Sequence, residues 1–249
     1  MIYSSNGQIL RQPQEAFSIR ALRQIAAPVK PFLCPELSFR GIPEALSFDE
    51  FRSSNESLLG AAVPYWAVAW PGGQALARWI LDHPHVVKGR TIVDVACGAG
   101  LAAAAAKRAG AERCIAADAD PNALVAARET AHLCGVDIET RLCDLRNLEP
   151  EPGSILCAGD LWYEREFARM ATGQLRHMAG AGFRIICADP GRPGRPRNNC
   201  NVIARYRIEV AADFEMTSPV YCEVFDLLNA SILDSHAPHE PDAPCGHAC

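Results

Sequence analysis

Hydrophobic and polar positions follow two rhythms along the central part of the chain. Short apolar runs, typical of buried strands, alternate with stretches in which apolar residues recur every three or four positions, the helical period. The expected strands are residues 91–95, 114–117, 138–143, 155–158 and 183–188, and the expected helices between them are residues 101–109, 122–134 and 164–178. Strands that alternate with helices predict βαβ units, and therefore a parallel sheet covered by helices on both faces.

The rhythm changes near the C-terminal end. Residues 206–210 and 220–228 have the pattern of two strands with no long helix between them, as in an antiparallel edge hairpin. We therefore expect an α/β fold: a Rossmann-like, doubly wound, seven-stranded, mostly parallel sheet with an antiparallel C-terminal edge hairpin.

The flanking regions have a different composition. Residues 1–60 contain two proline-interrupted stretches around one alternating run at residues 36–40, which predicts an N-terminal appendage with a short strand. A segment with three aromatic residues and a Pro-Gly-Gly turn, residues 64–73, follows, and a helix is expected to begin just after Gly73. The predicted organisation is an appendage at residues 1–60, an α/β domain at residues 61–228, and a flexible tail at residues 229–249.

Composition and charge limit the partners. The chain has 249 residues, of which 49% are hydrophobic and 21% charged, so it can form a sizeable core. Its net charge is −5, from 24 basic and 29 acidic residues, which gives no general basic field for nucleic acid. No apolar run approaches the ~20 residues that span a bilayer, and the first residues lack the basic and apolar regions of a secretory signal. We expect neither a nucleic-acid nor a membrane partner.

The 11 cysteines are scattered, and several lie inside apolar runs. This distribution is typical of core thiols in a reducing compartment, and it predicts a cytoplasmic protein. Histidines and cysteines gather in the tail without the paired spacing of a structural zinc site, so no metal is expected. These tail residues are His236, His239, Cys245, His247 and Cys249.

A glycine-containing turn follows the first expected strand of the sheet. Gly98 and Gly100, with Ala103, fit a dinucleotide-binding fingerprint, and glycines there let the backbone approach a ligand closely. Asp94, at the end of the strand, would repel a pyrophosphate but attract the ammonium and sulfonium of S-adenosylmethionine. This favours S-adenosylmethionine as the cofactor; the alternative is that Asp94 caps the following turn.

Acidic residues also follow the next two strands, at the sheet edge where open α/β sheets bind ligands. Asp118 can accept hydrogen bonds from both ribose hydroxyls, whereas Asp120 is expected to cap the helix that begins at Pro121. Asp144 can receive the adenine amino hydrogens, and Leu145 can pack on the ring; the alternative for Asp144 is a turn-forming role.

The residues after the fourth strand are the expected centre of the chemistry. Methyl transfer to nitrogen requires a neutral amine aimed at the sulfonium methyl, an oxygen that orients it and aromatic walls that exclude water. Asp160 and Tyr163 offer the polar groups and Trp162 a wall. The alternative is that both rings cover the sheet edge while Asp160 caps the helix that starts near Glu164.

Together, four motifs resemble the seven-β-strand (class I) methyltransferases, and specifically the electron-transfer flavoprotein β-subunit lysine methyltransferase family. They are the aromatic segment of residues 64–73, the Asp94/Gly98/Gly100 turn, Asp160-x-x-Tyr163, and Asp189-Pro-Gly-Arg192-Pro193. The resemblance runs from about Pro64 to Pro193. It implies that Trp70 and Gly72 border the cofactor, that Asp118 holds the ribose, and that Asp160 and Tyr163 shape a lysine channel. It also implies a flavoprotein subunit as the protein substrate, or a ribosomal protein in bacteria.

Other interpretations remain open from the residues alone. The chain can be a small-molecule N-methyltransferase with a nicotinamide-type acceptor, a non-catalytic cofactor-binding adaptor, or an NAD-dependent oxidoreductase. Residues 194–228 depart from the family's ending. Arg192, Arg195 and Arg197 form a basic loop that either meets an acidic protein partner or is solvated.

Overall fold

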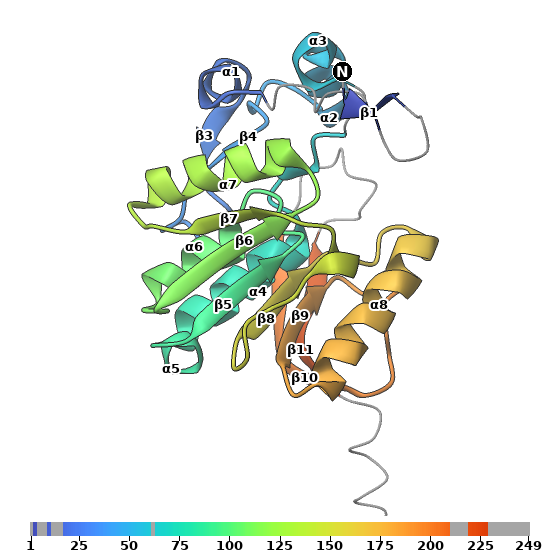
Figure 1. Cartoon of the computed structure of the whole chain (residues 1–249). Helices are drawn as coiled ribbons and strands as arrows, with labels where there is room; N and C mark the ends of the chain where they lie inside the picture. The colour runs from blue at the N-terminus through green and yellow to red at the C-terminus, as the bar shows by residue number, and fades with distance from the viewer. Residues whose placement is uncertain (1, 4–8, 11–16, 61–62, 210–218, 229–249) are drawn as a thin grey trace, which may run out of the picture.

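Seven strands form one sheet in the order β10-β11-β9-β8-β5-β6-β7 (Figure 1). The computed structural model describes residues 2–3, 9–10, 17–60, 63–209 and 219–228. The strands are β5 (Thr91–Val95), β6 (Arg113–Asp118), β7 (Glu139–Leu142), β8 (Ile155–Gly159), β9 (Arg184–Asp189), β10 (Cys200–Ile208) and β11 (Val220–Leu227). Strands β5 to β9 are parallel, and β11 runs antiparallel to both its neighbours, β9 and β10. The predicted Rossmann-like sheet with its antiparallel hairpin is confirmed.

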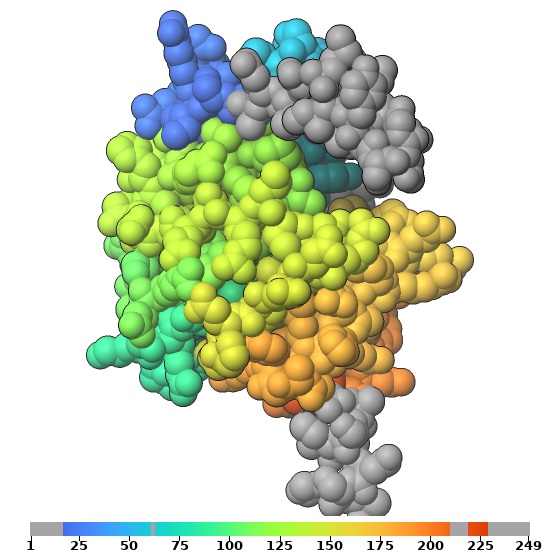
Figure 2. Space-filling model, viewed as in Figure 1, coloured from blue at the N-terminus to red at the C-terminus, as the bar shows by residue number. Residues whose placement is uncertain are grey.

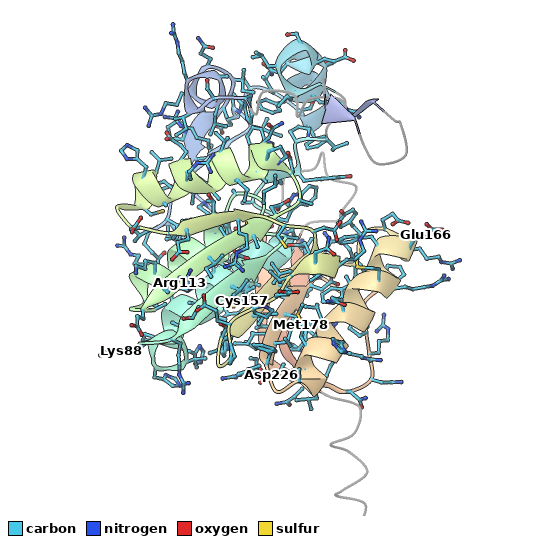
Figure 3. All side chains as sticks on the ribbon, viewed as in Figure 1. Lys88, Arg113, Cys157, Glu166, Met178 and Asp226 are labelled. Atoms are coloured by element: carbon cyan, nitrogen blue, oxygen red, sulfur yellow. The ribbon has the colours of Figure 1, made fainter. Side chains whose placement is uncertain are left out.

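The strand order reverses between β5 and β8, and this point positions the site. The chain runs from β5 outward through β6 to β7, then returns to β8 on the other side of β5. The carboxyl ends of β5 and β8 therefore lead into loops that diverge, which leaves a crevice for a ligand. Lys88 and Arg113 mark the opposite, amino-terminal edge of the sheet in Figure 3, and Glu166 at the start of α8 marks the carboxyl edge.

Helices cover both faces of the sheet. On one face lie α4 (Pro71–Asp82), α6 (Leu101–Arg108) and α7 (Pro121–Cys134), with the short α5 (Pro84–Val87) leading into β5; their alanine-rich sides share a core with the sheet. On the other face lie α8 (Arg165–Gly180) and the single turn η2 (Leu145–Asn147), whose core includes Met178 (Figure 3). Small alanine side chains let the helices approach the sheet closely, which keeps the strand ends in a fixed geometry.

Capping residues define where the two long helices begin. The Asp120 carboxylate accepts the Asn122 backbone N–H at 2.8 Å, so this residue caps α7 as predicted, and Gly135 ends the helix in a left-handed conformation. The Glu164 carboxylate accepts the backbone N–H groups of Glu166 and Phe167, and it therefore caps α8. The alternative in which Asp160 caps this helix is wrong.

The N-terminal elements lie toward the top of Figure 1. They are β1 (Ile2–Tyr3), β2 (Ile9–Leu10), α1 (Ile19–Ile25), β3 (Ala27–Val29), β4 (Phe39–Gly41), α2 (Phe48–Ser54), α3 (Glu56–Leu59) and η1 (Tyr65–Ala67). Of these, α1, β4 and η1 contact α7. A third apolar cluster joins Phe17, Leu22, Phe51 and Trp66 to alanines and Val125 of α7. Residues 17–60 therefore share a core with the sheet unit through α7.

An ion-pair network strengthens the same contact. The Glu129 side chain on α7 is 1% exposed. It accepts hydrogen bonds from Nε and Nη2 of Arg23, both at 2.8 Å, and from Nε of Arg40 at 3.2 Å. Because Arg23 belongs to α1 and Arg40 to β4, one buried carboxylate holds two N-terminal elements against α7.

Some element boundaries differ from the prediction. Helix α4 begins at Pro71, ahead of Gly73, because proline suits the first helical turn, where no N–H partner is needed. Strand β10 begins at Cys200 instead of residue 206; its outer positions, including Asn201 and Arg205, are exposed, which hides the apolar alternation. The strand expected at residues 36–40 is β4, Phe39–Gly41.

Other predictions concern residues that the structure describes only in part. In the described part of the chain, no helix is long and apolar enough to cross a membrane. The nine cysteines in the described ranges are free thiols. The predicted flexible tail, with its histidines and cysteines, lies outside the described residues.

Candidate active site

A cavity of about 530 Å³ opens at the carboxyl edge of the sheet, at the point where the strand order reverses. This volume lies in the range of about 300–1,000 Å³ typical of small-molecule sites. In Figure 2 the molecular surface is hollowed beside the start of α8. The predicted site residues that line the cavity are Trp70, Gly98, Asp118, Asp144, Leu145, Asp160 and Tyr163.

Asp118 joins the glycine turn to the start of α7. One carboxylate oxygen accepts the Gly98 N–H at 2.9 Å, and the other accepts the Asp120 N–H at 2.9 Å. Burial raises the pKa of Asp118. Each oxygen can accept a further hydrogen bond, so the geometry leaves room for the predicted contact with two ribose hydroxyls. Gly98 has φ +51°, and the nearest atom to a Cβ there would be Trp66 Cα at 3.8 Å, so its backbone is open to a ligand.

Asp94 has the capping role that the sequence left as an alternative. Its Oδ2 accepts the Ala103 N–H at 2.9 Å in the first turn of α6, and its side chain is buried. It also lines a smaller cavity of about 60 Å³, which shares Trp70, Gly98 and Asp160 with the main one. Burial raises the pKa of Asp94 to about 8. A cation bound in the smaller cavity would favour the ionised form, so the cap and the predicted charge partner are compatible.

Asp144 and Leu145 lie at the other end of the cavity. Asp144 begins η2 by accepting the Arg146 N–H at 2.8 Å, and it pairs with the Arg146 guanidinium at 2.6 Å. These bonds lower the pKa of Asp144 to about 2. Asp144 therefore has the turn-forming role that the sequence left as an alternative, and it also lines the cavity. Leu145 is buried and offers an apolar wall.

Three predicted site residues, Gly72, Gly100 and Trp162, line neither cavity. A Cβ on Gly72 would stand 2.6 Å from the Ala188 carbonyl oxygen and from Asp160 Oδ2, so Gly72 permits close packing. Gly100, at φ +73°, permits α6 to approach Ala127 on α7, where a Cβ would stand 2.9 Å from that side chain.

Trp162 is the third of these residues. Its indole N–H donates to Thr172 Oγ1 at 2.9 Å, and its ring packs against Phe225 in the core under α8. The prediction of Trp162 as a wall of the active site is wrong, and the alternative of a structural ring is correct for this residue. A large aromatic side chain gains more by burial in the core than at an open edge.

Asp160 is held on both carboxylate oxygens. Oδ2 accepts the Gly73 N–H at 2.8 Å, at the start of α4, and Oδ1 accepts Arg192 Nη1 at 2.6 Å. Its backbone has φ +59°, an unusual conformation that aspartate tolerates better than most residues. Burial raises the pKa of Asp160, and the Arg192 guanidinium opposes that rise. The carboxylate therefore sits at the cavity wall with a fixed direction.

Arg192 is a cavity residue that the sequence analysis placed in a basic loop. Its guanidinium pairs with Asp160 and, at 3.0 Å, with the fully buried Asp189. Arg195 is also paired inward, with Glu223, and stacks on Phe225. Of the three arginines only Arg197 is exposed, so neither interpretation of the loop holds for the other two. The signal in the sequence was a strand-end aspartate with an arginine three positions later.

Aromatic rings form a row along the cavity. Tyr65 lies 6.1 Å from Trp70 and 5.5 Å from Tyr163, whose ring lies 5.6 Å from Phe167, measured between ring centroids. All four rings line the cavity, and Tyr65 and Tyr163 are about half exposed. Such a row can flank the apolar stem of a long cationic side chain. The sequence placed Tyr65 in the aromatic segment but gave no role to it or to Phe167.

The set of groups fits S-adenosylmethionine. An acceptor carboxylate (Asp118), an apolar wall (Leu145), an open glycine backbone (Gly98) and a buried acid (Asp94) line two cavities that share residues at the sheet edge. The Asp160 carboxylate and the aromatic row lie on the same cavity and are available to a second substrate.

Comparisons with known proteins agree with this site. Residues 92–187 match the family model described as a methyltransferase domain. The fold resembles the solved structure of protein PH1948 from Pyrococcus horikoshii, with a TM-score of 0.51 at 13% identity, over 68% of this chain and 90% of that one. Fold, site and family model define an S-adenosylmethionine-dependent methyltransferase with a Rossmann-like sheet.

Two relatives refine the class. The electron transfer flavoprotein beta subunit lysine methyltransferase of Xenopus laevis is 39% identical over 64% of this chain; the match spans 65% of the relative's own length, just under two thirds. The Mus musculus protein of the same name is 31% identical over 82% of this chain and 78% of the relative. The chain belongs to the electron transfer flavoprotein beta subunit lysine methyltransferase family.

Proposed function

We propose that this chain transfers the methyl group of S-adenosylmethionine to a lysine side chain of an electron transfer flavoprotein β subunit. The observation that carries the proposal is the 31% identity to a lysine methyltransferase of that name across 82% of this chain. The site supports it, because Asp160 and Tyr163 line the same cavity as the cofactor-binding candidates.

The residues of the site suit a lysine substrate. When bound, the cofactor supplies an electrophilic methyl group on a sulfonium. A lysine amine has a pKa near ~10.4 in water and must lose its proton to attack. Removal from water and the positive charge of the bound cofactor would both lower that pKa, so no strong base is required. Asp160 accepts a hydrogen bond from the amine and directs its lone pair, while Tyr65 and Tyr163 flank the alkyl stem. Asp118, Gly98 and Asp94 would hold the cofactor, which would supply its methyl group to the neutral nitrogen and leave as the neutral thioether; the extra proton on the methylated amine would pass to solvent.

The direct test uses the purified protein, isotopically labelled S-adenosylmethionine and a purified flavoprotein β subunit. We expect label on a β-subunit lysine, located by mass spectrometry, and its loss in the Asp160→Asn variant. Ribosomal proteins and nicotinamide serve as parallel acceptors. Label confined to either of them would refute the flavoprotein substrate. Cofactor binding by calorimetry without transfer to any acceptor would favour an adaptor instead.

We also propose that the protein works in the cytoplasm, without nucleic acid or membrane as a partner. Free thiols at nine described cysteines and a net charge of −5 support this proposal. Cell fractionation followed by immunodetection is the corresponding measurement.

A further inference from the structure

Three charged side chains form a chain of contacts behind the cavity. Asp189, at the end of β9, accepts the backbone N–H groups of Gly191 and Arg192 with Oδ1, both at 2.7 Å. Its Oδ2 accepts Arg192 Nη1 at 3.0 Å, and the same nitrogen donates to Asp160 Oδ1 at 2.6 Å. Asp160 in turn accepts the Gly73 N–H. The contacts therefore connect the ends of β9 and β8 to the start of α4.

Burial makes this arrangement demanding. Asp189 is fully buried, and the side chains of Asp160 and Arg192 are 12% and 17% exposed. The two carboxylates depend on the Arg192 cation, because without it two negative charges would be buried side by side and unpaired, which is costly in free energy. Asp189 is bound to its own turn through two N–H groups, so it acts as the fixed end and Arg192 as the link.

We propose that Arg192 is a positioning residue for methyl transfer: held by Asp189, its guanidinium fixes the Asp160 carboxylate at the cavity wall. The proposal rests on the proposed function for the reaction that Arg192 serves. Arg192 acts through Asp160, which is the group expected to touch the substrate amine. A lysine at this position would keep the charge but lose the planar geometry that lets one guanidinium serve two carboxylates.

Other titratable groups surround Asp160. Asp189, from the end of β9, and Cys222, on β11, interact with it electrostatically. Tyr163, in the loop after β8, Tyr65, in η1, and Asp94, on β5, line cavities that Asp160 also lines. Arg192 is the cation beside this carboxylate, and it opposes the rise in the pKa of Asp160 that burial causes. Removal of the cation raises that pKa further, so the acid limb of the pH–rate profile moves to higher pH.

The experiment is a double-mutant cycle between Arg192→Met and Asp160→Asn. We expect Arg192→Met to lower kcat by on the order of tenfold or more and to move the acid limb upward, with cofactor affinity by calorimetry within about twofold of wild type. Arg192→Lys should lower kcat less and keep the acid limb in place. In the Asp160→Asn background, Arg192→Met should cause no further loss and no shift. Arg197→Met, in the same loop but exposed, is the matched control and should behave as wild type.

Several results would overturn the proposal. One is an acid limb of the pH–rate profile in Arg192→Met that is unchanged from wild type. Another is a kcat in the double variant that falls by the product of the two single losses. The third is the same shift of the acid limb when Arg192→Met is made in the Asp160→Asn background. If Arg192→Met fails to fold, Arg192→Lys takes its place in the cycle, and a multiplicative loss there overturns the proposal as well. The pKa of Asp160 can also be measured by carbon-13 NMR without any substrate. This pKa should be higher in Arg192→Met than in wild type. If wild-type protein methylates no lysine, the proposed function fails while this titration still decides the role of Arg192.

Discussion

Two adjacent glycines at the start of α4 have opposite surroundings, and this makes a sharp test of how Asp160 is held. A Cβ on Gly72 would stand 2.6 Å from both the Ala188 carbonyl oxygen and Asp160 Oδ2. A Cβ on Gly73 would meet no atom of the described structure within 4 Å. Neither glycine has a positive φ, so alanine fits the backbone at both positions.

The magnitudes follow from these distances. Gly72→Ala requires a shift of several tenths of an ångström in a backbone carbonyl or in the Asp160 carboxylate, and overpacking of this kind costs about 1–3 kcal/mol. Gly73→Ala replaces a helical glycine without a clash, which stabilises by up to about 1 kcal/mol. The free energies of unfolding of the two variants should therefore differ by about 1–4 kcal/mol, at roughly 2–4 °C in Tm per kcal/mol for a chain of this size.

The assay combines urea unfolding with turnover. Gly72→Ala should lose both stability and kcat, because its methyl group displaces Asp160. Gly73→Ala should gain stability, and any functional loss should fall on cofactor affinity, since Gly73 lines the smaller cavity. Equal stability in the two variants, or full turnover in Gly72→Ala, would show that Asp160 is not held against this glycine.

Three further outcomes are expected. Asp118→Asn should weaken cofactor binding by about 2 kcal/mol, roughly 30-fold by calorimetry, because a charged hydrogen-bond acceptor is lost; unchanged affinity would refute the ribose role. Cofactor affinity should rise with pH toward about 8, since a bound cation favours the ionised form of Asp94, whose pKa burial raises to about 8 in the free protein; Asp94→Asn should abolish this dependence, and a dependence that persisted would exclude Asp94 as its source. Glu129→Ala should lower the free energy of unfolding in urea by about 3 kcal/mol, because the mostly buried Arg40 loses its carboxylate partner. Glu166→Ala, at an exposed position, should change it by less than about 0.5 kcal/mol. Similar values for both variants would show that the Glu129 network does not stabilise the fold.

The periodic part of the fold could be predicted because each element there carries a local signal. The short apolar run of β5 and the Asp120 and Gly135 caps of α7 are read directly from neighbouring residues. Strand β10 was only half predicted, because it is an edge strand whose exposed positions, such as Asn201 and Arg205, interrupt the apolar pattern of its first half.

Some residues of the site could be predicted from their local position in the chain, whereas others depend on tertiary packing. Strand-end position predicted Asp118 and Asp160 at the cavity, since parallel strands end at one edge. The direction of a side chain beyond the strand end depends on the turn that follows, so Trp162 was assigned to the wrong side. Arg192 was missed because one of its two partners, Asp160, comes from the loop after β8 and is brought to it only by tertiary packing; Asp189, three positions earlier, was the only local signal. Gly72 and Gly100 were placed correctly in the chain, but their role is to admit neighbouring atoms of the protein.

The shared core between the N-terminal elements and α7 has a practical consequence for anyone who shortens this protein. Removal of residues 1–60 would uncover Trp66, Ala123 and Val125 and would leave Glu129 without either arginine. Trp66 and Ala123 also line the cavity, so the newly wetted surface would extend into the cofactor pocket itself. A trimmed enzyme that keeps all seven strands would therefore be expected to aggregate and to bind its methyl donor poorly.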